Sequence, residues 1–73
     1  MVDFAKMVVG TLERKMGPAA EDFAKDQCEE LGIELEDLSE ENKEEFADLV
    51  EENAAEITSE HDAEFMANVI RKL

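Results

Sequence analysis

The sequence has no tryptophan, no tyrosine, a single proline and a single cysteine among its 73 residues. Because Cys28 stands alone, no disulfide framework can form within the chain, and a reducing, cytoplasmic setting is expected. Without Trp and Tyr, the chain lacks the polar aromatic side chains that most often anchor binding interfaces. No apolar run exceeds three residues, as at Met7–Val9, whereas a membrane-spanning helix needs about 20. The sequence therefore predicts no membrane span.

Basic side chains are also scarce, since 7 Lys and Arg stand against 21 Asp and Glu, for a net charge of −14. The net charge is +1 over residues 1–17, −7 over 18–39 and −8 over 40–73. Such a surface repels phosphate backbones and anionic lipids, so partners among nucleic acids and membranes are not expected. A protein that meets the acidic faces would be basic. The alternative is that the acidic residues only keep the protein hydrated.

The positive feature of the sequence is helical periodicity, because apolar residues recur at spacings of three and four along most of the chain. Asp3, Ser39 and Ser59 are suited to cap helix starts, since their side-chain oxygens accept from unpaired backbone N–H groups. The pattern predicts an all-α fold, a compact bundle of four short helices in a single domain. The predicted helices span about 2–16, 18–31, 39–56 and 59–72, within the domain 1–73.

Three glycines interrupt this pattern, each in a different way. Gly17-Pro18 is expected to form a corner, because proline suits the first position of a helix and disfavours helical geometry at the residue before it. Gly32 is expected to be a left-handed C-cap, with an apolar contact from Ile33. Gly10 lies inside the first helix, which suggests that another helix passes close to it.

Few residues are suited to catalysis. Cys28 lies on an apolar stripe, where a buried and unreactive thiol is the usual outcome, and Ser39 and Ser59 are interpreted as caps. His61 and Glu64 share one helix face, but a single such pair is not the repeated Glu-x-x-His pattern of di-iron bundles. We therefore predict no enzyme activity, no catalytic or metal-binding residues and no cofactor. A metal-dependent activity at His61 is kept as an alternative hypothesis.

A carrier protein is another alternative. Acyl carrier proteins are short, acidic and four-helical, and their modified serine opens a helix within an Asp-Ser-Leu motif. Here "EDLSEEN" places Ser39 at the expected start of the third helix, although the order is Asp-Leu-Ser and Glu40 follows the serine. A plain helix cap explains the same residue.

The first helix carries more apolar side chains than its core-facing stripe requires. A surface of Val2, Met7, Val9 and Met16 is therefore predicted to contact a protein, either a second copy of the chain or a different partner. Methionine-rich surfaces adapt to varied partners. The function predicted from the sequence is a small acidic helical module that acts through protein contacts. The alternative is that these residues only complete the core of the monomer.

The segments "LERKMGPAAEDFAKDQCEELG", "FADLVEENAAEI" and "AEFMANVIRKL" resemble small helical domains of bacterial and archaeal proteins. In those domains a first helix ends at a Gly-Pro pair, a second helix rich in small residues follows, and two more helices close the fold. Gly17, Pro18, Ala20 and the apolar spacing carry the resemblance over residues 12–73. It implies a compact accessory domain of uncharacterised function and supplies no catalytic residue.

Overall fold

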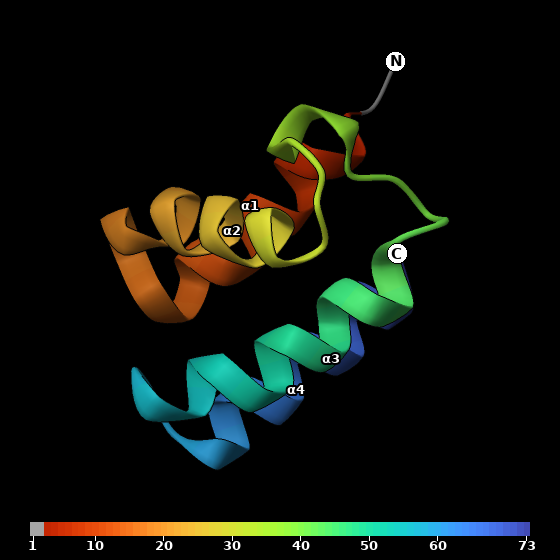
Figure 1. Ribbon diagram of the computed structural model, residues 1–73. Coiled ribbons are helices and arrows are strands. Elements are labelled where there is room, and N and C mark those ends of the chain that lie inside the picture. Colours follow the sequence, from red (N-terminus) through yellow and green to blue (C-terminus); the bar gives the residue numbers. More distant parts are fainter. Residues whose placement is uncertain (1–2) are drawn as a thin grey trace.

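The computed structural model describes residues 3–73, which form four α-helices (Figure 1). The helices are α1 (Phe4–Met16), α2 (Ala20–Glu30), α3 (Lys43–Asn53) and α4 (Glu60–Arg71). One 3-10 turn follows α1, another follows α3, and a third lies at Leu35–Asp37 between α2 and α3. Residues 3–73 contain no strand, and the predicted all-α bundle is confirmed.

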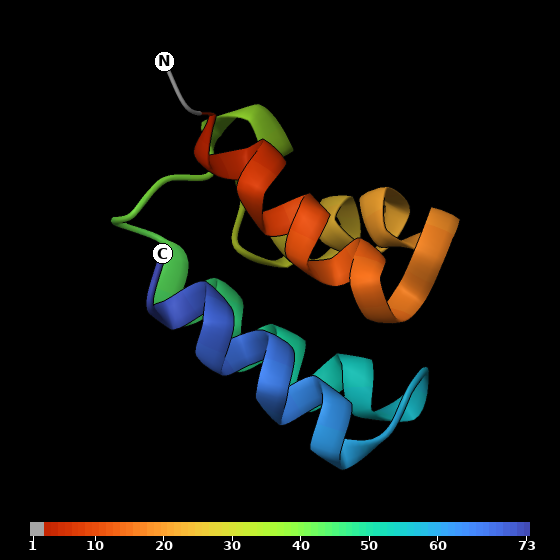
Figure 2. The same ribbon diagram turned by 180° about the vertical axis from the view of Figure 1, so that it is seen from behind.

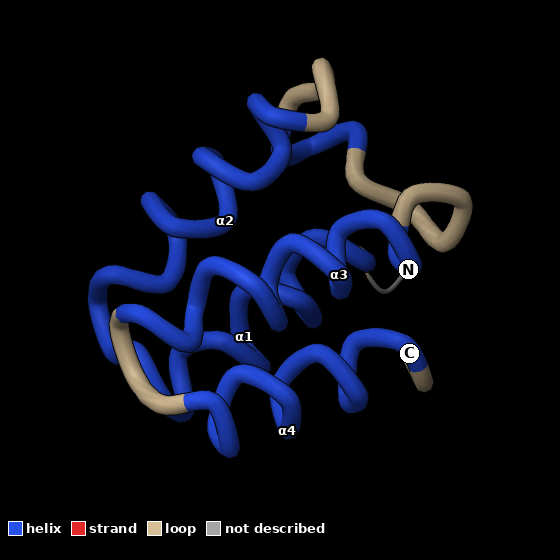
Figure 3. Tube along the Cα trace, turned by 60° about the horizontal axis from the view of Figure 1, so that its bottom comes forward, coloured by secondary structure: helices blue, strands red, loops and turns tan. Residues whose placement is uncertain are grey.

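The helices pack as two hairpins. Helices α3 and α4 run antiparallel and make the most extensive contact, while α1 packs on α2 and α4, and α2 reaches α3 (Figure 1, Figure 2). Irregular segments lie in the connections between helices and at the end of the chain after α4 (Figure 3). The Cα radius of gyration is 10.7 Å, close to the value of about 11 Å expected for a compact chain of this length.

The corner predicted at Gly17-Pro18 is confirmed. Helix α1 ends at Met16, and Gly17 takes a φ of 63°, which strains any residue with a Cβ, while its N–H donates to the carbonyl of Glu13. Pro18 then lies in a 3-10 turn, and α2 begins at Ala20, so the chain reverses within three residues.

The end of α2 also follows the prediction. Gly32 has a φ of 76°, its N–H donates to the carbonyl of Glu29 at 3.0 Å, and the N–H of Ile33 donates to that of Cys28 at 3.0 Å. This pair of hydrogen bonds is a Schellman cap. Ile33 packs on the core, and the cap turns the chain back so that the Leu35–Asp37 turn contacts both α1 and α2.

The start of the third helix differs from the prediction, because α3 begins at Lys43 rather than at Ser39. Ser39 opens a hydrogen-bonded turn instead. Its N–H donates to Oδ1 of Asn42 at 3.3 Å, and its Oγ accepts from the N–H of Glu41 at 3.3 Å. Ser and Asn side chains compete with the helix for backbone groups in this way. The cap was therefore placed one turn too early.

The core draws on all four helices. The largest side chains with no exposed surface are Phe46, Leu12, Met66, Ile70, Val8, Val50 and Cys28. One polar side chain is buried with them, that of Gln27 on α2. Its Nε2 donates to the carbonyl of Phe23 at 3.2 Å, and its Oε1 accepts from Nδ2 of Asn53 at 2.6 Å. This second bond ties α2 to α3 across the two hairpins.

Replacing Asn53 with alanine is expected to lower the free energy of unfolding by about 1–2 kcal/mol, because the Gln27 carbonyl would then be buried without its donor. Urea denaturation of the wild type and the variant measures this difference. The double variant Asn53→Ala, Gln27→Met should recover part of the loss, since it removes the unpaired group as well. An Asn53→Ala midpoint equal to that of the wild type contradicts the prediction.

Gly10 does not lie against another helix, so that expectation was wrong. A Cβ placed there would meet no atom within 4 Å, and the residue is exposed. Nothing within the described part of the chain therefore requires glycine at this position.

Gly10→Ala is expected to raise the free energy of unfolding by about 0.5–1 kcal/mol, because alanine restricts the unfolded chain and favours the helix. For a domain of this size that corresponds to a rise in Tm of roughly 4–8 °C per kcal/mol, measured by thermal circular dichroism. Gly17→Ala is the control, and it should lower the Tm because its φ of 63° suits only glycine. If both variants shift the Tm in the same direction, the argument fails.

Candidate functional site

The described residues of the contact surface predicted from the sequence do not form one continuous surface in the structure. Val2 lies outside the described residues, and Met7, Val9 and Met16 are each partly buried. Val9 and Met16 pack against the core. Met7 borders a small hollow together with Phe4 and Ser39–Glu41, whereas Val9 lines a larger groove. Two residues of helix turn the chain by about 200°, so Met7 and Val9 face different sides of α1.

Among residues 3–73, the large apolar side chains that are exposed are instead Ile57 and Phe65, at 57% and 49% exposure. The Lys15 ammonium lies 5.5 Å from the centre of the Phe65 ring, and it also pairs with Asp62 at 3.5 Å. Lys15 thus joins α1 to α4.

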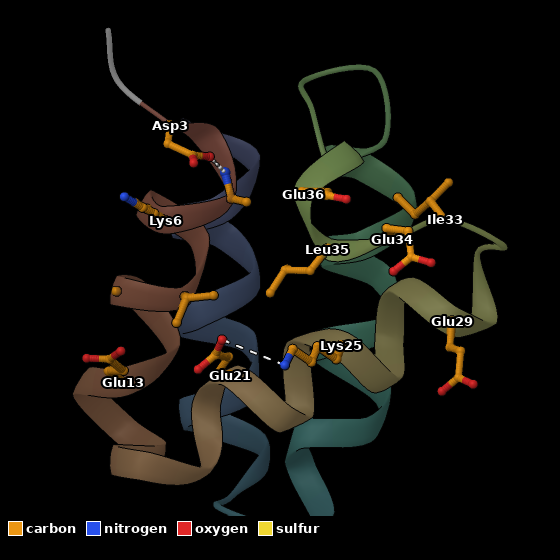
Figure 4. Close-up of a pocket in the computed structure, with 13 residues that line it drawn as sticks. Asp3, Lys6, Glu13, Glu21, Lys25, Glu29, Ile33, Glu34, Leu35 and Glu36 are labelled. Atoms are coloured by element: carbon orange, nitrogen blue, oxygen red, sulfur yellow. Dashed lines mark hydrogen bonds and ion pairs between the residues drawn. The ribbon is translucent and has the colours of Figure 1, made fainter.

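A groove of about 980 Å³ lies between α1, α2 and the segment Ile33–Glu36 (Figure 4). We call it the groove. Its apolar lining consists of Ala5, Val9, Ile33 and Leu35. Gly10 also lines the groove, and because glycine has no side chain, the α1 backbone is open to the groove at this position. Leu35 extends from its turn into the space between α1 and α2 (Figure 4). The groove exists because the Gly32 cap returns the chain to α1 at this point.

Charged side chains line the groove around this apolar part. Six are carboxylates, and two are the ammonium groups of Lys6 and Lys25. The carboxylates are those of Asp3, Glu13, Glu21, Glu29, Glu34 and Glu36. Asp3 caps α1 by accepting from the N–H of Ala5 at 3.0 Å, and Glu21 pairs with Lys25 at 3.8 Å (Figure 4).

The other four groove carboxylates, those of Glu13, Glu29, Glu34 and Glu36, have no ion pair within 4.0 Å among residues 3–73. The contrast with α3 is clear. There the Arg71 guanidinium lies 2.7 Å from Asp48 and 3.0 Å from Glu51, and its Nε lies 3.7 Å from Glu44. The hydrogen bonds that the Arg71 guanidinium donates to Asp48 and Glu51, chiefly the one to Asp48, raise the pKa of Arg71 above its ordinary value. The acidic face of α3 is thus partly neutralised by Arg71, whereas these four groove carboxylates have no such partner among residues 3–73.

The candidate catalytic residues are not brought together in an accessible site. Cys28 is fully buried on α2, and burial raises the pKa of its thiol from 9.0 to about 11. His61 is exposed on α4, as is Glu64 one turn further on. Within the described residues, no three His, Cys, Asp or Glu side chains gather as a metal site would require.

Ser39 is half-buried, and its hydroxyl is engaged in the turn before α3. Besides accepting from Glu41, the Oγ lies 3.3 Å from Oδ1 of Asn42, to which it donates. The serine of an acyl carrier protein opens a helix, whereas here Asn42 precedes the first residue of α3. The carrier alternative therefore gains no support from this geometry.

Comparison of the chain with protein-family models, with curated proteins and with solved structures finds no match. The resemblance to small prokaryotic helical domains accordingly stays a hypothesis. A search of the described helices for one long and apolar enough to cross a bilayer finds none.

Proposed function

We propose that this protein is a non-enzymatic binding module of the cytoplasm, which contacts another protein through the groove. The observation that supports the proposal is the groove itself, an open concavity of about 980 Å³ with an apolar lining inside a charged margin. In a protein of unassigned function, a well-formed concavity with an apolar lining and polar groups around it is the first candidate for a binding site. Val9 is one of the four residues of the contact surface predicted from the sequence, and it lines the groove. Part of that predicted surface therefore belongs to the proposed binding site.

A different protein is favoured over a second copy of the chain as the partner. Each copy carries a net charge of −14, and like-charged surfaces repel one another at short range. The groove margin has the same sign as most of the rest of the surface, so two copies offer no charge complementarity there. A homodimer through Met7 or Met16 stays a prediction from the sequence.

Photocrosslinking from inside the groove tests the proposal. A photoreactive amino acid at position 10 faces open space, and the matched control places it at Glu64, an exposed position on α4. We expect discrete protein adducts in the native cells from position 10 and not from position 64. An excess of the unlabelled protein should compete for them. Equal adduct patterns from the two positions would overturn the proposal.

A further inference from the structure

The groove is long enough to hold part of a helix. On α1 its lining runs from Ala5 to Glu13 and on α2 from Glu21 to Glu29, which at 1.5 Å per residue corresponds to about 12 Å on each helix. That length matches about two turns of a third helix. Helix-in-groove recognition places apolar residues at i, i+3, i+4 and i+7 against such an apolar lining.

Gly10 lies within the part of α1 that lines the groove. Glycine in a helix interior is destabilising, yet no atom of the described chain comes near enough to need its missing side chain. The open space at Gly10 therefore faces whatever enters the groove. Because Gly10 has no side chain, a partner helix can approach the α1 backbone closely at this position.

The charges decide which kind of helix fits. Glu29, Glu34 and Glu36 are exposed at the α2 side and at the turn, and no ion pair within residues 3–73 holds them. Lys25, the nearest cation on α2, is already paired with Glu21. A partner with Lys or Arg beside its apolar face would meet unpaired carboxylates, whereas an acidic helix would be repelled.

We infer that the groove binds a basic amphipathic helix of another protein, with the apolar face of that helix on Val9, Ile33 and Leu35 and its cations on Glu29, Glu34 and Glu36. This inference rests on the proposed function and names the chemistry of the partner. Close approach at Gly10 fixes the depth at which the helix lies.

The probe is a synthetic Lys/Leu amphipathic peptide of about 14 residues, a length at which an isolated helix begins to be stable. Fluorescence anisotropy of the labelled peptide against the full chain measures its Kd. Two control peptides are compared with it. One has the same composition in scrambled order, which removes the apolar face, and the other carries Gln in place of Lys, which removes the charge. We expect saturable binding of the amphipathic basic peptide, and binding at least about tenfold weaker for the other two.

Two variants locate the binding. Gly10→Gln fills the groove without changing the charge, and it should weaken binding about tenfold or more while leaving the helical circular dichroism spectrum unchanged. The triple variant Glu29→Gln, Glu34→Gln, Glu36→Gln should also weaken binding and flatten its dependence on salt. The matched control removes three exposed carboxylates elsewhere, at Glu52, Glu56 and Glu64, and should bind nearly as the wild type does.

Each contrary result has a definite meaning. Equal weakening by the two triple variants, or equal binding of the scrambled peptide, shows attraction by net charge alone and overturns the inference. So does unchanged binding to Gly10→Gln. If position 10 yields specific adducts but the basic peptide does not bind, the proposed function stands and the partner chemistry is wrong. If the peptide binds in the groove but no adducts form, the proposed function fails instead.

Discussion

Replacing Phe46 with alanine is expected to lower the free energy of unfolding to about zero, so that a large fraction of the protein is unfolded at 25 °C. Phe46 lies on α3 with no exposed surface and is the largest of the fully buried side chains. Truncation of a buried phenylalanine costs about 3–5 kcal/mol, because it removes apolar contacts and leaves a cavity. A single core in a chain of this size supplies about the same amount, roughly 3–5 kcal/mol. Far-ultraviolet circular dichroism with urea denaturation measures the outcome.

Phe65→Ala is the matched control, since it deletes the same atoms from a side chain that is 49% exposed. Its main specific contact is with the Lys15 ammonium, 5.5 Å from the ring centre, and such exposed cation–π pairs contribute about 0.5–1 kcal/mol. The Phe65 variant should therefore stay folded with a slightly lower midpoint. Equal losses at the two positions would contradict the burial that the structure assigns to them.

Alkaline pH is expected to destabilise the fold through Cys28. Burial raises the pKa of this thiol from 9.0 to about 11, so the folded state favours the protonated form. Above pH 9 the unfolded chain loses this proton while the folded chain keeps it, and the free energy of unfolding falls. Two pKa units correspond to about 3 kcal/mol in full, of which about 2 kcal/mol is lost by pH 11. The contribution is complete below pH 9.

Cys28→Ala separates this effect from the titration of the lysines. We expect the wild type to lose about 2 kcal/mol more than the variant between pH 8 and pH 11, by urea denaturation at each pH. Thiolate absorbance gives a second measure, and the absence of tyrosine from the sequence removes the main overlapping signal. A thiolate that forms near pH 9 in the folded protein, or parallel pH profiles for the two proteins, would contradict a buried thiol.

The local features of the fold were predictable because they depend on neighbouring residues. The corner at Gly17, the cap at Gly32 and the capping of α1 by Asp3 each follow from dihedral preferences or from a side chain two residues away. The start of α3 was not predicted correctly. Ser39 is a residue type that favours helix starts, but its side chain and that of Asn42 hydrogen-bond to each other within the preceding turn, and Asn42 does not cap α3 through its side chain.

The candidate site was only partly predictable. Val9 belonged to the predicted contact surface and does line the groove, but the acidic groove residues looked the same in the sequence as those that solvate α3. Gly10 was expected to face a neighbouring helix, whereas it faces open space. Local residue spacing could not predict which acidic residues line the groove or what Gly10 faces. Both depend on how α1, α2 and the Leu35–Asp37 turn are placed relative to one another.

The sequence by itself determined that the chain is helical and where most helices end, and it indicated the buried face of each helix. These properties follow from periodicity and backbone preference, which act over a few residues. The tertiary structure alone decided that Gln27 meets Asn53, that Arg71 pairs with carboxylates of α3, and that a groove opens beside Gly10. Such features join residues 20 or more positions apart, and their geometry is set by how the packed helices cross.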